Sequence, residues 1–269
     1  MSQDHVVGEK KGTIFYITLN RSDKRNAINF DMFIAIAEIL EDVIIDPEIR
    51  AIILKGEGKI FSSGIDINSL LMLVDRYSPE HASGGAPIRA DIIRYQRFFT
   101  RLQDIEIPVI CAMHSMALGV AVELALACDI RLMSDDCRWG LPEGRFGVIP
   151  DMGGIARLSR LIGSSRTMEV LSTGNLYTAE QALDWGLASY LFPKEKLFEE
   201  AEKLARDIAQ SGPLAVGAIK KVVTKGADMD LMTQLDMEAN FQSMLLKSED
   251  FMEGIQSTMK KRAPRWKRK

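Results

Sequence analysis

Hydrophobic positions in the first two thirds of the chain follow two alternating patterns. Short apolar runs rich in β-branched residues predict four strands, over residues 13–20, 51–55, 109–113 and 130–133. Between them, apolar residues recur at three- and four-residue steps, which predicts helices over residues 30–44 and 88–104. Strands that alternate with helices are typical of an α/β protein.

After Pro193 the strand pattern stops. Four segments with helical periodicity follow, over residues 196–210, 213–224, 229–246 and 248–260. We therefore divide the chain into an α/β core over residues 1–195 and a helical C-terminal subdomain over residues 196–269. Apolar residues such as Met229 and Leu235 would leave a face of this subdomain exposed, and contacts between subunits would cover it.

Composition narrows the class of protein. The chain has 46% hydrophobic and 26% charged residues and a formal net charge of -3, which excludes a disordered or collagen-like protein. No run approaches the roughly 18 apolar residues that a membrane span needs, and residues 1–12 lack a signal-peptide core. The three cysteines and three histidines have no metal-ligand spacing. We expect a cytoplasmic protein without a membrane contact or a metal site.

One acidic residue interrupts a hydrophobic helical pattern. Residues 117–128 read ALGVAVELALAC, which is apolar on every face except at Glu123. A helix that is apolar all round is buried, and a buried carboxyl forms an ion pair, takes up a proton or lines a cavity. Glu123 is therefore either half of a structural ion pair or a catalytic acid or base with a raised pKa.

Two further carboxyls lie at chain reversals. Glu143 is in WGLPEG, and Asp151 follows in GVIPDMGG, just before a helix predicted to begin near Gly153. A Glu in a loop is usually solvated, and Asp151 would cap that helix; acid/base chemistry is the functional alternative for both. Residues 61–66, FSSGID, predict a strand-to-helix turn whose backbone N–H groups can bind an oxyanion.

Two polar segments complete the pattern. Residues 260–269, KKRAPRWKRK, include seven basic residues and predict a solvated tail, with the phosphates of a nucleotide-bearing ligand or of RNA as functional alternatives. Residues 75–87 predict a surface loop, or a mobile wall of a substrate pocket.

Together these motifs resemble the crotonase superfamily, also called the enoyl-CoA hydratase/isomerase family. The matching segments, in order along nearly the whole chain, are NRSDKRNAI (20–28), FSSGIDI (61–67), HSMALGVAVELALACDIR (114–131), PEGRFGVIPDMGGIARL (142–158) and TAEQALDWGLA (178–188). The resemblance implies a spiral of strand–strand–helix units with a helical C-terminal part. It also implies a coenzyme A thioester as substrate, no separate cofactor, and assembly as a homotrimer or homohexamer.

The resemblance also assigns roles. The N–H groups of Ile65 and Val120 would bind the thioester carbonyl and stabilise an enolate. Glu123 and Glu143 match the two catalytic glutamates of the hydratases, one taking a proton from water and the other delivering one to Cα. Many relatives have three glycines at 119–121, so Val120 would provide its N–H where Val disfavours a positive φ. Residues matching the substrate-binding and coenzyme A-binding positions are Lys24, Arg25, Ala27, Ser63, Gly64, Asp66 and Gly119.

We expect a hydratase that adds water reversibly to a trans-2-enoyl-CoA thioester. Asp151 and the segment 61–66 resemble dienoyl-CoA isomerases, so a double-bond isomerase that uses Asp151 and Glu143 is the alternative. A protein that binds acyl-CoA or RNA without catalysis is a third reading, supported only by the basic tail. Nucleic acid is not an expected partner, and the sequence does not define the acyl-chain length.

Overall fold

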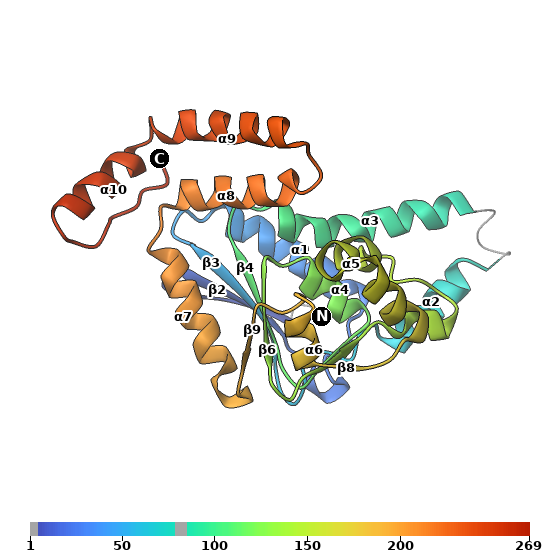
Figure 1. Ribbon diagram of the computed structural model, residues 1–269. Helices are drawn as coiled ribbons and strands as arrows, with labels where there is room; N and C mark the ends of the chain where they lie inside the picture. Colours follow the sequence, from blue (N-terminus) through green and yellow to red (C-terminus); the bar gives the residue numbers. More distant parts are fainter. Residues whose placement is uncertain (1–4, 79–84) are drawn as a thin grey trace.

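The computed structural model describes residues 5–78 and 85–269, and their strands form two sheets (Figure 1). The larger sheet has the order β1 (Val6–Lys11), β2 (Ile14–Leu19), β3 (Ala51–Gly56), β4 (Val109–Met113), β6 (Ile130–Ser134), β9 (Tyr190–Phe192). The smaller sheet has the order β5 (Met116–Leu118), β7 (Arg138–Gly140), β8 (Tyr177–Thr178). Strand β1 is antiparallel to β2, and the other neighbours in the larger sheet are parallel.

The four predicted strands correspond to β2, β3, β4 and β6, which confirms the α/β class. The sequence pattern missed the other strands for two physical reasons. Strand β1 is at the edge of the sheet and buries only Val6, so it carries little hydrophobic signal. Strands β5, β7, β8 and β9 have two or three residues each, which is too short for a period of two to be visible.

The first helices pack beside the sheets. They are α1 (Phe30–Ile45), α2 (Ile67–Arg76), α3 (Gly85–Asp104), α4 (Val120–Leu126), α5 (Gly154–Thr173) and α6 (Ala179–Asp184). Helices α1 and α3 contact one another through Phe33 and Phe99, whose ring centroids are 5.2 Å apart. The predicted loop over 75–87 is shorter than expected, because α2 and α3 extend into both of its ends; residues 79–84 lie outside the described part.

Helix α7 (Leu197–Ala209) covers the larger sheet, at the left of Figure 1. Its buried residues Leu197, Ala201 and Ala205 recur every four positions and pack in one cluster with Ile53 and Leu132 of the sheet. The first helix of the predicted C-terminal subdomain thus shares a hydrophobic core with the α/β part. The division into two domains at residue 195 stays a prediction.

Helices α8 (Pro213–Gly226), α9 (Leu231–Leu245) and α10 (Glu249–Met259) match the predicted helical segments, and α9 and α10 project from the rest of the molecule (Figure 1). Lys220 anchors α8 to the core. Its Nζ lies 2.7 Å from Asp129 Oδ2 and donates hydrogen bonds of 2.8 and 3.0 Å to the carbonyls of Leu102 and Ile107. Within the described residues, no helix is long and apolar enough to cross a membrane.

The basic tail is largely exposed to solvent, as predicted, but it also folds back onto α10. Arg262 forms an ion pair of 2.6 Å with Glu253 and lowers the pKa of that carboxyl to about 2. The buried Asp250 accepts the backbone N–H groups of Lys267 and Arg268 at 2.7 and 3.0 Å. The carboxylates of α10 therefore hold the basic segment, as acids near a helix N-terminus attract N–H groups and cations.

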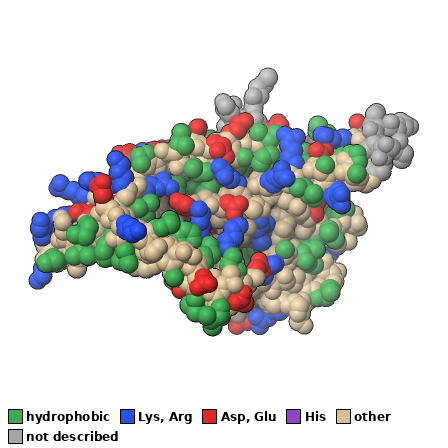
Figure 2. Space-filling view, turned by 90° about the horizontal axis from the view of Figure 1, so that it is seen from above, with side chains coloured by type: hydrophobic (Ala, Val, Ile, Leu, Met, Phe, Trp, Pro, Cys, Tyr) green, Lys and Arg blue, Asp and Glu red, His purple; other side chains and the backbone are tan. Residues whose placement is uncertain are grey.

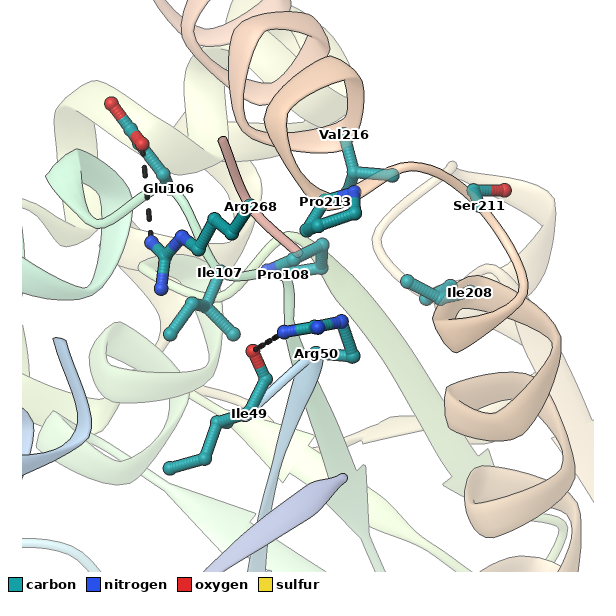
Figure 3. A pocket seen from close by; sticks show the side chains of 10 residues that line it. All are labelled: Ile49, Arg50, Glu106, Ile107, Pro108, Ile208, Ser211, Pro213, Val216 and Arg268. Carbon is teal, nitrogen blue, oxygen red and sulfur yellow. Dashed lines mark hydrogen bonds and ion pairs between the residues drawn. The ribbon is translucent and has the colours of Figure 1, made fainter. Parts of the chain in front are cut away.

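A small pocket of about 10 Å³ lies where the tail meets the core (Figure 3). Arg268 approaches Glu106 to 4.0 Å. Burial lowers the pKa of Arg50, and the positive charge of Arg268 lowers it further. Arg50 donates to the carbonyl of Ile49 at 3.3 Å. The pocket has room for about one water molecule, and none of the residues around it belongs to the predicted site.

Candidate active site

Backbone hydrogen bonds bring the motifs of the sequence together. Residues 26–28 pair with residues 62–66, residues 62–66 pair with residues 116–118, and Gly119 donates to the carbonyl of Gly140. The connecting backbone bonds measure between 2.7 and 3.2 Å. Four segments that are far apart in the sequence thus lie side by side, and they carry half of the predicted site residues.

The break between β5 and α4 is formed by Gly119, not by Val120. Gly119 has φ +53° and Val120 begins α4 with a negative φ. The strain expected at Val120 therefore does not arise, because the glycine adopts the left-handed conformation that Val disfavours. The predicted helix over 117–128 is also shorter than expected, since its first two residues belong to β5.

The N–H groups of Ile65 and Val120 lie on adjacent turns. A Cβ atom on Gly64 would be only 2.7 Å from the carbonyl oxygen of Leu118, so the two turns are in direct contact. Within the described residues, neither N–H group has a hydrogen-bond acceptor. Two neighbouring N–H groups without acceptors are what an oxyanion site requires.

Glu123 lies in a helix in which every residue is buried, and is itself 2% exposed. Its Oε1 accepts the N–H group of Gly154, at the start of α5, at 2.8 Å. Burial and the charges of Glu143 and Asp151 raise its pKa to about 8, although the Gly154 N–H group lowers it. Among the described residues Glu123 has no ion pair, so the geometry favours the acid/base interpretation over the structural one.

Glu143 lies in the 3-10 turn η2 (Pro142–Phe146), close to the turn between β5 and α4. A Cβ atom on Gly119 would be 2.7 Å from its Oε1. Its Oε2 is buried and has no hydrogen-bond partner in the described part of the chain. Burial and the charge of Asp151 raise its pKa to about 7. This carboxyl is therefore not solvated, unlike most Glu side chains in loops.

Asp151 is not the N-cap of α5, which corrects one sequence prediction. The capping position is Gly153, with φ +98° and no side-chain hydrogen bond, so the helix begins at Gly154. The carboxyl that bonds the first helical N–H group is instead Glu123, from another helix. Asp151 lies in the turn before the helix, where burial raises its pKa and where its charge raises the pKa values of Glu123 and Glu143.

The residues predicted to bind coenzyme A lie on the segment that pairs with the turn over residues 61–66. Lys24 and Arg25 are exposed at the 3-10 turn η1 (Ser22–Lys24), and Ala27 is half-buried. The carbonyl of Arg25 accepts the N–H group of Ser63 at 3.0 Å. These side chains are thus next to the Ile65 turn, with their cations in solvent.

Asp66 is placed differently from a ligand-binding residue. Its carboxylate caps α2 by accepting the N–H group of Asn68 at 2.9 Å, and it forms an ion pair with Arg21. The hydrogen bond from Arg21 lowers the pKa of Asp66. Both carboxylate oxygens are therefore engaged within the protein.

Sequence reasoning missed two residues whose side chains bond the backbone around the turn over residues 61–66. Asn26 is fully buried, and its amide donates to the carbonyls of Glu57, Ile60 and Phe61 at 2.8 to 3.0 Å. The Ser62 hydroxyl donates to the carbonyl of Asn26 at 2.7 Å and accepts the N–H group of Gly64 at 3.1 Å. No local signal distinguishes such residues, because their partners are distant in the sequence.

The arrangement can move protons beside a carbonyl group. Glu123, with a pKa of about 8, keeps its proton to higher pH than Glu143, with a pKa of about 7. One carboxyl can then accept a proton while the other donates one. Among the described residues, no three His, Cys, Asp or Glu side chains converge as they would around a metal ion.

The fold belongs to a known class. An enoyl-CoA hydratase from Bacillus anthracis superimposes with a TM-score of 0.88 and 30% sequence identity, over 98% of this chain and 100% of that one. This establishes the crotonase fold predicted from the motifs. The family model described as enoyl-CoA hydratase/isomerase matches residues 9–269. The chain belongs to the enoyl-CoA hydratase/isomerase family, which is a family of enzymes.

Relatives at similar identity have different activities. The peroxisomal Delta(3,5)-Delta(2,4)-dienoyl-CoA isomerase of Arabidopsis thaliana is 32% identical, over 94% of this chain and 92% of the relative. The 2,3-dehydroadipyl-CoA hydratase of Escherichia coli K12 is also 32% identical, over 97% of this chain and 98% of the relative. Similarity therefore establishes the family and leaves the choice between hydration and isomerisation to the site.

The raised pKa of Glu123 predicts how stability depends on pH. As pH rises from the ordinary value of 4.5 towards about 8, the unfolded chain releases this proton while the folded protein keeps it, so rising pH favours unfolding. Glu123→Gln does not titrate, and its amide oxygen can still accept the Gly154 N–H group. Each pKa unit corresponds to about 1.4 kcal/mol, so we expect the variant's stability relative to wild type to increase by about 2 kcal/mol or more between pH 5 and pH 9.

Urea unfolding at pH 5, 7 and 9 measures this difference. Glu38→Gln, on the exposed side of α1, is the matched control and should keep a constant difference from wild type. A stability difference between Glu123→Gln and wild type that does not increase with pH would contradict the proton assignment.

Proposed function

We propose that the protein is an enoyl-CoA hydratase that adds water reversibly to a trans-2-enoyl-CoA thioester. The observation that carries the proposal is the pair of the buried Glu123 and the half-buried Glu143, whose pKa values are raised and which lie beside two N–H groups without acceptors among the described residues. Water addition to a carbon–carbon double bond needs one group that takes a proton and one that gives a proton. The pair provides both when one carboxyl is protonated and the other is ionised.

In the proposed reaction, the thioester carbonyl oxygen lies between the N–H groups of Ile65 and Val120. These donors stabilise the enolate that develops when oxygen adds to Cβ, a contribution on the order of 3 kcal/mol per donor in comparable sites. The ionised carboxyl of the pair removes a proton from the attacking water. The protonated carboxyl then delivers its proton to Cα, which regenerates the pair with its proton on the other side.

The binding of the coenzyme A part of the substrate also belongs to the proposal. The exposed Lys24 and Arg25 would meet the phosphates of coenzyme A, and Ala27, Ser63, Gly64 and Gly119 would line the path to the thioester. Proton transfer and backbone N–H groups suffice for this reaction, so the enzyme would use no cofactor beyond the coenzyme A of its substrate. The cytoplasmic location is a proposal from composition, and one relative is named as peroxisomal.

A panel of enoyl-CoA and dienoyl-CoA thioesters tests the reaction, because hydration adds the mass of one water and isomerisation leaves the mass unchanged. We expect a product heavier by one water from a simple enoyl-CoA. Glu123→Gln and Glu143→Gln should each lower turnover by about two orders of magnitude or more, the scale of losing an acid/base group. Glu38→Gln should leave turnover at the wild-type level. Wild-type turnover in either site variant would remove that residue from the mechanism.

Asp151 supports isomerisation as a second candidate. It is a third carboxyl, half-buried and close enough to both glutamates to raise their pKa values, and it does not serve as a helix cap. When a double bond migrates along the acyl chain, one carbon loses a proton and a carbon further along gains one. A third carboxyl would allow the second transfer.

Asp151→Asn separates the two candidates. Since Asn does not titrate, we expect the variant to lose double-bond migration in a dienoyl-CoA while it keeps hydration of a simple enoyl-CoA. Product masses and the diene absorbance of each reaction provide the measurement, with folding checked by circular dichroism. Equal loss of both activities in a folded variant would show that Asp151 serves the Glu123 and Glu143 pair itself.

The C-terminal helices support the proposed assembly into a homotrimer or homohexamer. No residue of α9 is buried, and Leu231 and Met232 are 70% and 67% exposed. A groove of about 520 Å³ is lined by apolar residues of α8 and α10, including Leu214 and Phe251. Hydrophobic side chains also reach the surface where Figure 1 places α10, in the view from above (Figure 2). Exposed apolar surface of this kind marks contact sites between proteins.

Light scattering at micromolar concentration should give a trimer or a hexamer. The double variant Leu231→Glu/Met232→Glu should dissociate the assembly, because charges are costly in an apolar contact. Asp236→Glu on the same helix keeps its charge and should not change the mass. A wild-type monomer would contradict the proposed assembly.

A further inference from the structure

The turn that precedes α5 is held from two sides. On one side, the N–H group of Gly154 bonds the Glu123 carboxyl at 2.8 Å. On the other side, two successive carbonyls of the turn, those of Asp151 and Met152, each accept a hydrogen bond from a side chain. The donors are Gln96 of α3 and Arg157 of α5.

Gln96 controls one peptide plane. Its Nε2 donates to the carbonyl of Asp151 at 2.7 Å. In a trans peptide the C=O and N–H bonds point in opposite directions, so fixing the carbonyl of Asp151 towards α3 fixes the N–H group of Met152 away from α3. Hydrogen bonding from the Met152 N–H group lowers the pKa of Glu123, which places that N–H group on the Glu123 side.

Arg157 controls the next peptide plane. Its Nη1 donates to the carbonyl of Met152 at 2.8 Å, and its Nε and Nη2 donate to Gln103 Oε1 at 2.8 Å and Thr100 Oγ1 at 3.3 Å. The guanidinium thereby links the turn to α3. A Cβ atom on Gly153 would collide with Arg157 Nη1, so the glycine leaves the space that the guanidinium occupies.

We propose that Gln96 and Arg157 are positioning residues that orient the turn 151–154, so that the carbonyls of Asp151 and Met152 face these two side chains and the turn's N–H groups face Glu123. Neither side chain is placed on the substrate. They act through the backbone on the Glu123 carboxyl and on the carboxyl-bearing residue Asp151 within the same turn. The inference rests on the proposed function only for its kinetic consequences.

The expected consequence concerns the proton of Glu123. The charged groups that face it are Glu143 from η2, Asp151 from the turn and Arg157 from α5. A looser turn would weaken the hydrogen bonds that favour the ionised Glu123, so its proton would be held to higher pH. The orientation of the carboxyl would also be less well fixed, which costs rate more than binding.

Two variants test this without changing the net charge. Gln96→Met removes the donor to Asp151, and Arg157→Lys keeps the cation but loses the planar fork that reaches α3. In each we expect the alkaline limb of the kcat profile to move upward by about one pH unit. We expect kcat to fall on the order of 10-fold while KM changes less than about two-fold.

Matched controls use exposed residues of the same types. Arg160, also on α5, donates to the carbonyl of Ala156 at 2.7 Å but pairs with Asp228 away from the site, so Arg160→Lys should keep the wild-type profile. Gln256→Met on α10 is the control for Gln96. Wild-type alkaline limbs in both test variants, or a rise in KM with kcat unchanged, would overturn the inference.

A measurement without substrate separates this inference from the proposed function. The difference in unfolding free energy between Glu143→Gln and Glu123→Gln/Glu143→Gln, followed from pH 5 to pH 10, reports the proton of Glu123. Adding Gln96→Met to both proteins should move its inflection upward by about one pH unit. If the wild type converts no thioester but this shift occurs, the proposed function fails and the positioning role stands; an unmoved inflection overturns the positioning role whatever the activity.

Discussion

The structure depends on keeping the carboxyl of Glu123 inside an apolar helix, where it forms no ion pair with any described residue. Burial of an ionised carboxylate is expensive, so the surroundings must either protonate it or offer N–H groups. Both occur: its pKa is raised to about 8, and the N-terminus of α5 presents the Gly154 N–H group. Glycine at position 154 leaves room for that contact, because a Cβ atom added there would lie 2.8 Å from Glu123 Oε1. This contact joins α4 to the start of α5.

Residues whose role depends on local pattern could be predicted from the sequence. Glu123 was recognisable because a charge inside an all-apolar helix is unusual, and the long helices and buried strands were recognisable from their period. Asn26 and Arg157 could not be recognised, because their partners lie far away in the sequence. The N-cap prediction for Asp151 failed for a related reason: capping residues are identified from their neighbours, whereas the carboxyl that bonds the start of α5 comes from α4.

In the C-terminal region, acidic residues of α10 bind the basic segment, which composition alone did not indicate. The basic segment suggested a solvated tail, yet α10 begins with Glu249 and Asp250 and continues to Glu253, which together offer carboxylates to that segment. Trp266 adds a hydrogen bond of 3.0 Å to the carbonyl of Gln210. The cations that could have bound a polyanion are therefore partly neutralised within the chain, which weighs against the RNA-binding interpretation. The exposed apolar residues of α9 are the feature of this region that supports the proposed assembly.

Three carboxyls with raised pKa values lie near one another, and this arrangement supports both of the reactions proposed for the site. In the proposed hydration, Glu123 and Glu143 would serve as the base and the acid that address adjacent carbons. In the alternative isomerisation, Asp151 would act further along the acyl chain, and its position in the turn before α5 would determine how far it reaches. That turn is the same one whose N–H group bonds Glu123. In the proposed mechanism, the orientation of this turn would affect both the proton of Glu123 and the placement of Asp151, so a rotation of this backbone would change the balance between the two reactions.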